Sequence, residues 1–266
     1  MTGTAAPPVI RLGGVRKEFS NGVVALDGLD LEVREGEFLS LLGPSGCGKS
    51  TALRIVAGLM SADAGTVRVS ASAATGDPAR HDIAHHDIAY VFQEPTLMPW
   101  ASAFDNVWLP LRLAGISRRG AGDRVRAALA GVGLDGFEAA YPRELSGGMR
   151  MRVSIARALV TRPRLLLMDE PFAALDEITR FKLNDDLLRL TEAQGWTVVF
   201  VTHSVFESAF LASRIAVMSA RPGRIAGEIA VDVPYPRSAA FRTDPRFAEI
   251  CRATSTVLQR AMGEAA

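Results

Sequence analysis

The sequence predicts an α/β fold with a mostly parallel sheet, an antiparallel β subdomain and an inserted α-helical subdomain. Strand-like and helix-like segments alternate along the chain, as in sheets whose strands are joined by helices. Residues 165–168 and 197–201 are unbroken apolar runs, which are typical of parallel strands covered on both faces. A helical run at residues 50–57 follows a short apolar strand and a glycine-rich loop. Together these observations indicate a mostly parallel α/β core.

The first part of the chain is predicted to form an antiparallel entry region. Residues 9–12, 29–33 and 38–42 are short runs that favour β-structure, and turn signals such as Asn21-Gly22 separate them. The stretch from residue 70 to 86 is rich in alanine and has little periodicity. We therefore expect a loop or an irregular strand there.

Two later parts of the chain are predicted to be a helical insertion and a C-terminal tail. Residues 98–141 are punctuated by proline and glycine and carry apolar residues at helical spacing, so we expect a helical subdomain at about residues 98–160 inserted within a domain spanning residues 9–231. In the tail, residues 232–266, Asp244 is expected to cap a helix with Pro245 at its first position. The residues that would share its apolar face are Phe247, Ile250, Thr254, Val257, Leu258 and Ala261.

The composition excludes several classes of protein. The 266 residues include 30 basic and 29 acidic side chains, and a net charge of +1 leaves no general electrostatic footprint for nucleic acid or anionic lipid. At 48% hydrophobic and 22% charged residues, the chain is too rich in core-forming residues to be disordered. No apolar run approaches the roughly 20 residues that span a bilayer, and residues 1–9 do not resemble a secretion signal. Cys47 and Cys251 lie in different contexts, so we expect a reduced, intracellular protein without a disulfide.

A phosphate-binding loop is the strongest chemical motif. The run that fits the pattern G-x-x-x-x-G-K-[ST] is Gly43-Pro44-Ser45-Gly46-Cys47-Gly48-Lys49-Ser50. It follows a strand and opens a helix, so backbone N–H groups and the helix dipole would face the phosphates. Lys49 would neutralise phosphate charge and the Ser50 hydroxyl would bind Mg²⁺. The alternative, a chance glycine-rich turn, is disfavoured because both flanking elements are correct, and the loop therefore predicts a P-loop NTPase core.

An apolar strand that ends in two carboxylates forms the second motif. Asp169 and Glu170 follow the apolar run at residues 165–168. The strand would deliver Asp169 to the magnesium ion, while Glu170 would orient or deprotonate the attacking water. A surface Asp-Glu pair before Pro171 is the alternative, and the upstream phosphate loop argues against it.

The third motif offers a second anion site. Ser146, Gly147 and Gly148 present a hydroxyl and free backbone N–H groups where a helical run begins. Taken alone, these residues would be interpreted as an ordinary helix cap.

In this order the three motifs resemble the nucleotide-binding subunit of ATP-binding cassette (ABC) transporters, over about residues 10–229. Four smaller matches extend the resemblance. Phe19 corresponds to the aromatic residue that stacks on adenine, and Gln93 to the glutamine loop. Ala174-Leu175-Asp176 corresponds to the D-loop, and His203 to the switch histidine.

The resemblance implies a full set of site residues. Those expected to bind the nucleotide are Phe19, Gly43, Pro44, Ser45, Gly46, Cys47, Gly48, Lys49, Ser50, Thr51, Gln93, Ser146, Gly147, Gly148 and Asp176. The expected catalytic residues are Glu170, His203 and Lys49, and the expected magnesium ligands are Ser50, Gln93 and Asp169. His203 follows a strand, so its place would be at the carboxyl end of the sheet, where it could hydrogen-bond the γ-phosphate.

The chain departs from the family pattern at three kinds of position. Met149 stands where glutamine is commoner, and Ala173 stands where many members have serine. The three histidines of the 70–86 stretch, His81, His85 and His86, could suggest a metal site. No cysteine or carboxylate set completes one at a recognisable spacing, so we favour a solvated loop.

The resemblance also implies cofactors, partners and a location. Two cassettes pack head to tail with each ATP, accompanied by Mg²⁺, between one phosphate loop and the other signature motif, so the chain is expected to form a homodimer. It would dock on two transmembrane permease subunits at the cytoplasmic face of the inner membrane, and reach an extracytoplasmic solute-binding protein only indirectly. Residues 93–100 and 219–225 resemble the importers of nitrate, sulfonates and taurine. The alternatives are a soluble ABC ATPase acting on nucleic acid or ribosomes, which would need a basic surface, and a catalytically idle regulatory module.

Overall fold

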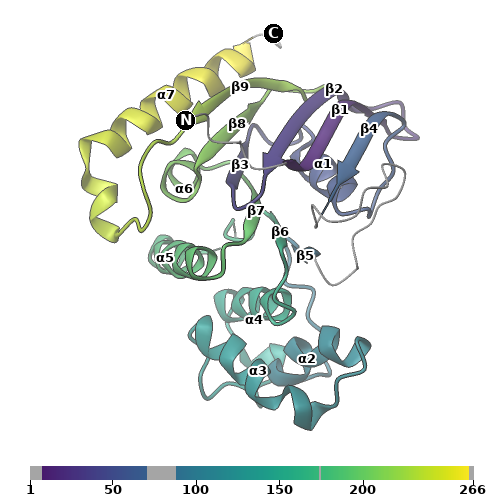
Figure 1. Ribbon diagram of the computed structural model, residues 1–266, viewed down its shortest axis with the longest axis vertical. Coiled ribbons are helices and arrows are strands. Elements are labelled where there is room, and N and C mark those ends of the chain that lie inside the picture. The colour runs from purple at the N-terminus through teal and green to yellow at the C-terminus, as the bar shows by residue number, and fades with distance from the viewer. Residues whose placement is uncertain (1–7, 71–87, 174, 264–266) are drawn as a thin grey trace, which may run out of the picture.

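The α/β fold consists of two sheets and the helices packed around them (Figure 1). The computed structural model describes residues 8–70, 88–173 and 175–263. A three-stranded sheet has the order β2-β1-β4, and a six-stranded sheet has the order β5-β6-β7-β3-β8-β9. The strands are β1 (Pro8–Glu18), β2 (Val24–Arg34), β3 (Phe38–Leu42), β4 (Ala64–Val69), β5 (Ile88–Val91), β6 (Leu165–Asp169), β7 (Thr197–Thr202), β8 (Arg214–Met218) and β9 (Ile225–Ala230). The predicted fold class is confirmed.

The smaller sheet is antiparallel, and the prediction for this region is only partly correct. β1 pairs antiparallel with both β2 and β4, and these strands include residues 9–12 and 29–33. The third predicted run, Phe38–Leu42, instead forms β3 in the middle of the larger sheet, where it is parallel to β7 and β8. All five of its residues are buried, as required of a strand that has neighbours on both edges and layers on both faces.

The larger sheet is covered on both faces. Its strands β5, β6, β7, β3 and β8 are parallel, and β9 runs antiparallel at the edge. In β6, Leu166 and Met168 pack in the core under the helices of one face. Leu165 and Leu167 pack in the second core with α1 (Lys49–Val56) and the antiparallel sheet. This alternation across two faces explains why the sequence shows an unbroken apolar run.

Three helices form a group at the end of the molecule away from the antiparallel sheet (Figure 1). They are α2 (Ala103–Leu113), α3 (Arg118–Gly131) and α4 (Gly147–Leu159), with a short 3₁₀ turn, η1 (Pro142–Glu144), before α4. The hydroxyls of Ser102, Ser117 and Ser146 each accept an N–H three residues on, which satisfies one open donor per helix. Pro110, one of the proline and glycine residues expected to interrupt this segment, instead lies inside α2. The remaining helices α5 (Glu177–Gln194) and α6 (Val205–Leu211) follow β6 and β7.

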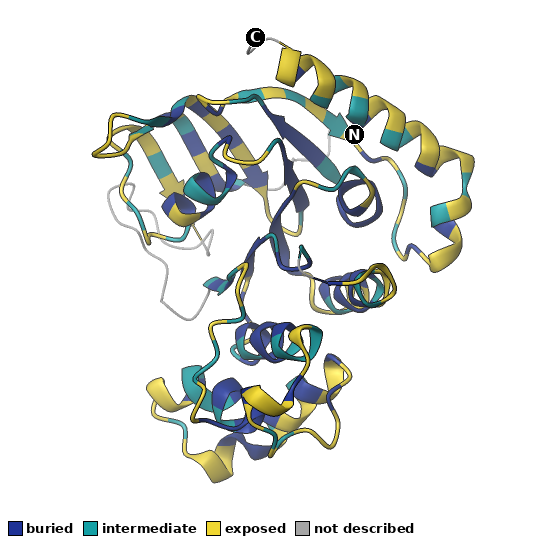
Figure 2. Ribbon diagram, turned by 180° about the vertical axis from the view of Figure 1, so that it is seen from behind, coloured by how far each residue is buried: buried dark blue, intermediate teal, exposed yellow. Residues whose placement is uncertain are grey.

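The tail packs on its own chain. After a 3₁₀ turn, η2 (Ala239–Thr243), helix α7 (Pro245–Gly263) begins at Pro245, and Asp244 Oδ1 accepts the N–H of Arg246 at 2.9 Å. α7 lies along β8, β9 and α6, with Phe247 against Phe206 and Phe241. Figure 2 shows that its outward face is exposed. None of the described helices, α7 included, combines the length and apolarity that crossing a bilayer requires.

Candidate functional site

The phosphate loop joins β3 to α1, and its glycines are required by geometry. Gly46 and Gly48 have φ angles of 75° and 102°, in the left-handed region. A Cβ on Gly48 would lie 2.7 Å from the carbonyl oxygen of Ala25. The loop can therefore pass this close to β2 only with glycine at position 48. The backbone N–H groups at the start of α1 then lie at the loop, on the side where a phosphate would bind.

Lys49 holds a buried positive charge inside the loop. Its side chain is 3% exposed, and Nζ donates to the carbonyl oxygens of Gly43 at 2.8 Å and Pro44 at 2.9 Å. The same Nζ lies 3.7 Å from Glu170 Oε1. The ammonium group is thus fixed at the loop, where it suits a polyphosphate.

Asp169, at the end of β6, accepts hydrogen bonds from two hydroxyl groups. Ser50 Oγ donates to Asp169 Oδ1 at 2.6 Å, and Tyr90 OH donates to Oδ2 at 3.1 Å. Burial, together with the charge of Asp169, raises the pKa of Tyr90 well above its usual value, so the phenol remains a donor. A carboxylate beside a serine hydroxyl at the phosphate loop is the oxygen donor set that Mg²⁺ prefers, so the residues present fit this ion. Tyr90 was not predicted, because only the pairing of β5 with β6 brings it to Asp169.

Glu170 lies between Lys49 and His203 in a strained backbone conformation. Its φ is 46°, which is uncommon outside glycine, and its N–H donates to Val201 O at 3.0 Å. Glu170 Oε2 lies 3.3 Å from His203 Nδ1, and the His203 side chain is half exposed. The carboxylate is therefore held between a lysine and a histidine at the carboxyl ends of β6 and β7.

A cavity of about 220 Å³ lies beside the phosphate loop and Glu170, and Asp169, Tyr90 and His203 are not in its lining. It is lined by Phe19, Val23, Ala25, Gly46, Gly48, Lys49, Ser50, Thr51, Glu170 and Arg221. The structure thus brings the predicted aromatic residue, the loop and the predicted base together. Arg221 was not predicted to be in the site; its guanidinium donates to Gly46 O through Nε at 3.2 Å and Nη2 at 3.1 Å.

The other predicted residues lie outside this cavity. Gln93 is exposed beyond β5 and does not line it. Ser146, Gly147 and Gly148 open α4, where Ser146 Oγ accepts the Met149 N–H at 3.2 Å. Asp176 caps α5 and accepts the Thr179 N–H at 2.9 Å, which lowers the pKa of its carboxyl group. Within one chain, therefore, Ser146, Gly147 and Gly148 do not line the cavity at the phosphate loop.

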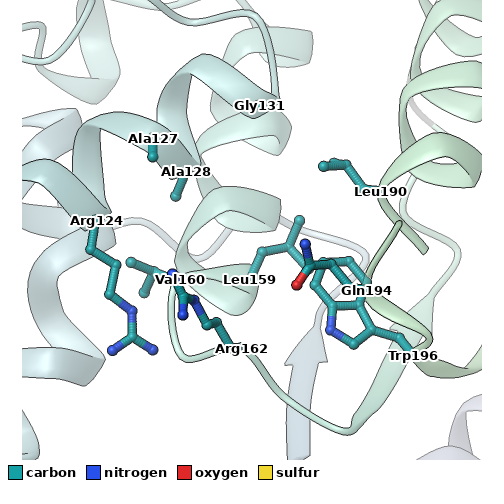
Figure 3. A pocket seen from close by; sticks show the side chains of 10 residues that line it. All are labelled: Arg124, Ala127, Ala128, Gly131, Leu159, Val160, Arg162, Leu190, Gln194 and Trp196. Carbon is teal, nitrogen blue, oxygen red and sulfur yellow. The ribbon is translucent and has the colours of Figure 1, made fainter. Parts of the chain in front are cut away.

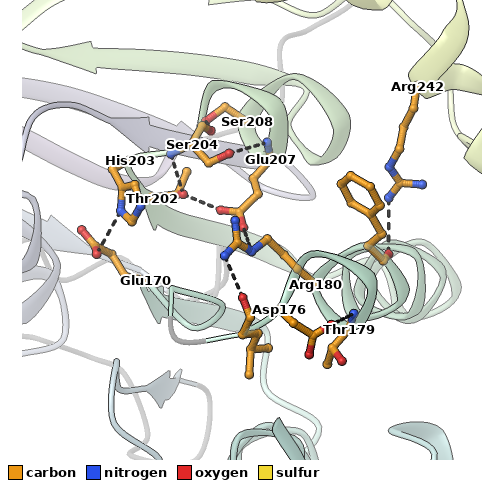
Figure 4. A network of polar contacts seen from close by, with 12 residues as sticks. Glu170, Asp176, Thr179, Arg180, Thr202, His203, Ser204, Glu207, Ser208 and Arg242 are labelled. Carbon is orange, nitrogen blue, oxygen red and sulfur yellow. Dashed lines mark hydrogen bonds and ion pairs between the residues drawn. The ribbon is translucent and has the colours of Figure 1, made fainter. Parts of the chain in front are cut away.

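A buried carboxylate that the sequence did not reveal connects the end of β7 to α5 (Figure 4). Glu207 is 6% exposed; its Oε2 accepts the hydroxyl of Thr202, the residue before His203. Its Oε1 lies 3.6 Å from Arg180 Nε, and Arg180 Nη2 donates to Leu175 O, next to Asp176, at 2.9 Å. Burial raises the pKa of Glu207. Glu207 thus links the segments that carry His203 and Asp176.

We expect Glu207→Gln to slow the ATP hydrolysis that the resemblance implies about tenfold, while changing the free energy of unfolding by no more than about 1 kcal/mol. The amide still accepts from Thr202 and avoids the cost of burying a charge, but it loses the attraction to Arg180. Steady-state ATPase assays and urea unfolding would measure the two effects. Glu228→Gln on β9, which removes an ion pair with Arg214 of β8, is the control. A loss of stability without a change in kcat would contradict a positioning role.

The remaining predictions concern the D-loop alanine, the three histidines and the two cysteines. Ala174 of the D-loop and His81, His85 and His86 lie outside the described residues. Among the residues that are described, no three His, Cys, Asp or Glu side chains gather in an arrangement that could hold a metal ion. Cys47 and Cys251 are both free thiols, and Cys47 is buried in the loop, which raises its pKa.

A phosphate loop between a central strand and a helix, with a strand-end aspartate bonded to its serine, defines a P-loop nucleoside triphosphatase. A family model described as ABC transporter matches residues 26–173. An uncharacterized ABC transporter ATP-binding protein of Methanocaldococcus jannaschii is 45% identical over 239 residues, 90% of this chain and 86% of the relative. An aliphatic sulfonates import ATP-binding protein of Pseudomonas savastanoi pv. phaseolicola is 44% identical over 246 residues, 92% of this chain and 94% of the relative.

Solved structures agree with these relatives. The dimeric structure of a bacterial ABC transporter cassette aligns with a TM-score of 0.73 and 32% identity, over 85% of this chain and all of that one. A post-hydrolysis state of an ATP-binding cassette bound to ADP and Pi aligns with a TM-score of 0.74 and 33% identity, over the same shares. The chain belongs to the ABC transporter family, as an ATP-binding subunit with ATPase activity.

Proposed function

We propose that this chain powers an importer for aliphatic sulfonates or closely related small solutes such as taurine or nitrate. The observation that carries the choice of solute is the similarity to relatives named for aliphatic sulfonate import, one in Pseudomonas savastanoi at 44% identity and one in Bacillus cereus at 40% identity over 91% of the chain. In this proposal residues 9–231 form the ATPase domain, with the helical subdomain at about 98–160 inserted in it. Residues 232–266 form the tail.

The separation of the two anion-binding motifs supports a head-to-tail dimer. Lys49 and Ser50 line the cavity, whereas Ser146 and the two glycines after it do not. A second copy would bring its own α4 N-terminus, and the Asp176 of its D-loop, over the first copy's cavity. Each ATP would then lie between one phosphate loop and the partner's signature motif, as the dimeric architecture of the similar cassette suggests.

The positions of the residues in and around the cavity support a role for each of them in this proposal. Phe19 would stack on the base, and Lys49 would move from the loop carbonyls and Glu170 to the phosphates. Ser50 and Asp169, with Gln93, would hold Mg²⁺, which when bound supplies charge neutralisation of the phosphates. Glu170 would accept the proton of the attacking water, and His203 would hydrogen-bond the γ-phosphate and hold Glu170 in place.

A groove on the helical side of the molecule supports docking on a permease. It has a volume of about 510 Å³ and lies between β5 and α2, with Tyr90, Leu109 and Leu113 in its lining. Leu113 is 79% exposed, and Trp100 at the start of the same helical region is 76% exposed. Exposed apolar side chains beside an apolar groove are typical of a protein interface, here with two transmembrane subunits at the cytoplasmic face of the membrane. The solute-binding protein would act only through that permease.

The test is ATP hydrolysis by the complex with its permease and binding protein in proteoliposomes. We expect 1-butanesulfonate to stimulate hydrolysis several-fold. Leu113→Asp should abolish the stimulation and leave the basal rate of the isolated subunit unchanged, because a charge in the groove opposes docking. The matched control is Leu59→Asp, at an exposed leucine after α1. No stimulation by sulfonates, taurine or nitrate would refute the choice of solutes, and a parental response of the Leu113 variant would refute the docking groove.

A further inference from the structure

A second cavity, unrelated to the ATP site, lies between the helical group and the main sheet (Figure 3). It has a volume of about 170 Å³ and is lined by residues of α3, of the end of α4 and the turn after it, and of the end of α5, together with Trp196 just before β7. It shares no lining residue with the cavity at the phosphate loop.

Two arginines line this cavity without an acidic partner. Within the described residues, neither the Arg124 nor the Arg162 guanidinium forms an ion pair or a hydrogen bond, and Arg124 Nε is buried without an acceptor. The pKa of Arg124 is lowered by burial and then by the positive charge of Arg162. Arg124 is partly buried and Arg162 is exposed, and because neither guanidinium is paired with a carboxylate, both are free to donate hydrogen bonds to an anion in the cavity.

The opposite wall is apolar. Trp196 is 6% exposed and Leu190 also lines the cavity, whereas Figure 3 shows the Arg124 side chain on the other side of the space from Trp196. The α3 wall consists of short side chains, Ala127, Ala128 and Gly131, and Leu190 of α5 lies close to Gly131. Gln194 adds an amide between Leu159 and Trp196 in the view of Figure 3. The cavity therefore has a cationic side and an apolar side.

We propose that this cavity binds a small organic anion with a short apolar tail, of the alkyl sulfonate or alkyl carboxylate class. The oxyanion would accept hydrogen bonds from Arg124 and Arg162, and the tail would lie against Trp196 and Leu190. The volume is that of roughly six water molecules, which accommodates such an ion and is too small for a nucleotide or a peptide.

A ligand in this position would tie together two parts of the molecule. Arg124 belongs to α3, in the helical group, whereas Trp196 precedes β7 of the main sheet. Because the ligand would contact both, its binding stabilises their present arrangement and raises the temperature of unfolding by mass action.

The experiment uses the purified full chain without nucleotide or partners, so its outcome is independent of any import activity. 1-Butanesulfonate is titrated by calorimetry, with tryptophan fluorescence to follow Trp196 and thermal unfolding as a third readout. We expect saturable binding that Arg124→Gln and Arg162→Gln each weaken at least about tenfold. Arg119→Gln, at an exposed arginine of the same helix outside the cavity, is the matched control and should bind as the parent does.

Two comparison probes separate the contributions of head and tail. Sodium sulfate lacks the tail and 1-butanol lacks the charge, so each should bind much more weakly than 1-butanesulfonate. The proposal is overturned if no saturable binding occurs at millimolar concentration, if the two cavity variants bind as the control variant does, or if sulfate binds as tightly as the sulfonate. The unfolding temperature of each variant, measured without ligand and compared with that of the parent, distinguishes a loss of binding from a loss of fold.

Discussion

Glu170→Gln is expected to reduce ATP turnover by about 10²- to 10⁴-fold while leaving ATP binding intact. The Glu170 carboxylate lies beside Lys49 and His203 at the cavity, where an attacking water would be activated. Glutamine keeps the size of the side chain and an acceptor for His203, but it cannot take a proton. The ATP-bound state should therefore accumulate, and with it the head-to-tail dimer that ATP would hold closed.

Steady-state ATPase assays and size-exclusion chromatography with and without ATP measure both effects. Glu249→Gln is a suitable control, because Glu249 is an exposed carboxylate on the tail helix α7, far in sequence from the motifs. It should hydrolyse ATP at the parental rate. Parental hydrolysis by the Glu170 variant would remove the carboxylate from its proposed role, and a variant that stays monomeric with ATP would argue against the composite site.

The groups of the site that sequence reasoning found are those fixed by local geometry. The phosphate loop needs only a strand, glycines at the strained positions Gly46 and Gly48, and a following helix, all contiguous in the chain. Asp169 and Glu170 likewise end a recognisable buried strand. A motif that is complete within a dozen residues can be interpreted without knowing the tertiary fold.

The groups that sequence reasoning missed depend on pairing between distant segments. Tyr90 reaches Asp169 only because β5 lies beside β6, and Arg221 reaches Gly46 across 175 residues. Glu207 is an ordinary acidic residue in a helix until its contacts with Thr202 and Arg180 are known. No local periodicity distinguishes such residues from exposed charges.

The misassigned strand has a similar cause. Phe38–Leu42 follows two antiparallel strands in the sequence after a short turn, so continuity with them was the natural interpretation. Its uniformly apolar pattern, Phe-Leu-Ser-Leu-Leu, fits a strand buried on both faces better than one with an exposed face. The buried Ser40, whose hydroxyl bonds to Ser208 Oγ at 2.7 Å, is the only polar side chain in it.

Lys49→Met is expected to weaken ATP binding by about 30- to 150-fold, in contrast to the Glu170 variant. The ammonium group is 3% exposed and is held within hydrogen-bonding distance of two loop carbonyls, so the protein maintains a dehydrated cation at the place where phosphates would lie. Losing charge-assisted bonds worth roughly 2 to 3 kcal/mol in total gives this change in affinity. Methionine fills a similar volume, so the loop should keep its shape.

Calorimetric titration with ATP measures the change, and Lys182→Met, at an exposed lysine on α5, is the control that removes a charge elsewhere. The decisive comparison is between the Lys49→Met and Glu170→Gln variants. If Lys49 binds phosphate and Glu170 acts only on the water, the first variant loses affinity and the second loses turnover at retained affinity. Equal loss of ATP affinity in both would mean that the 3.7 Å contact between Lys49 and Glu170 shapes the loop itself, and that the two roles cannot be divided between the two residues.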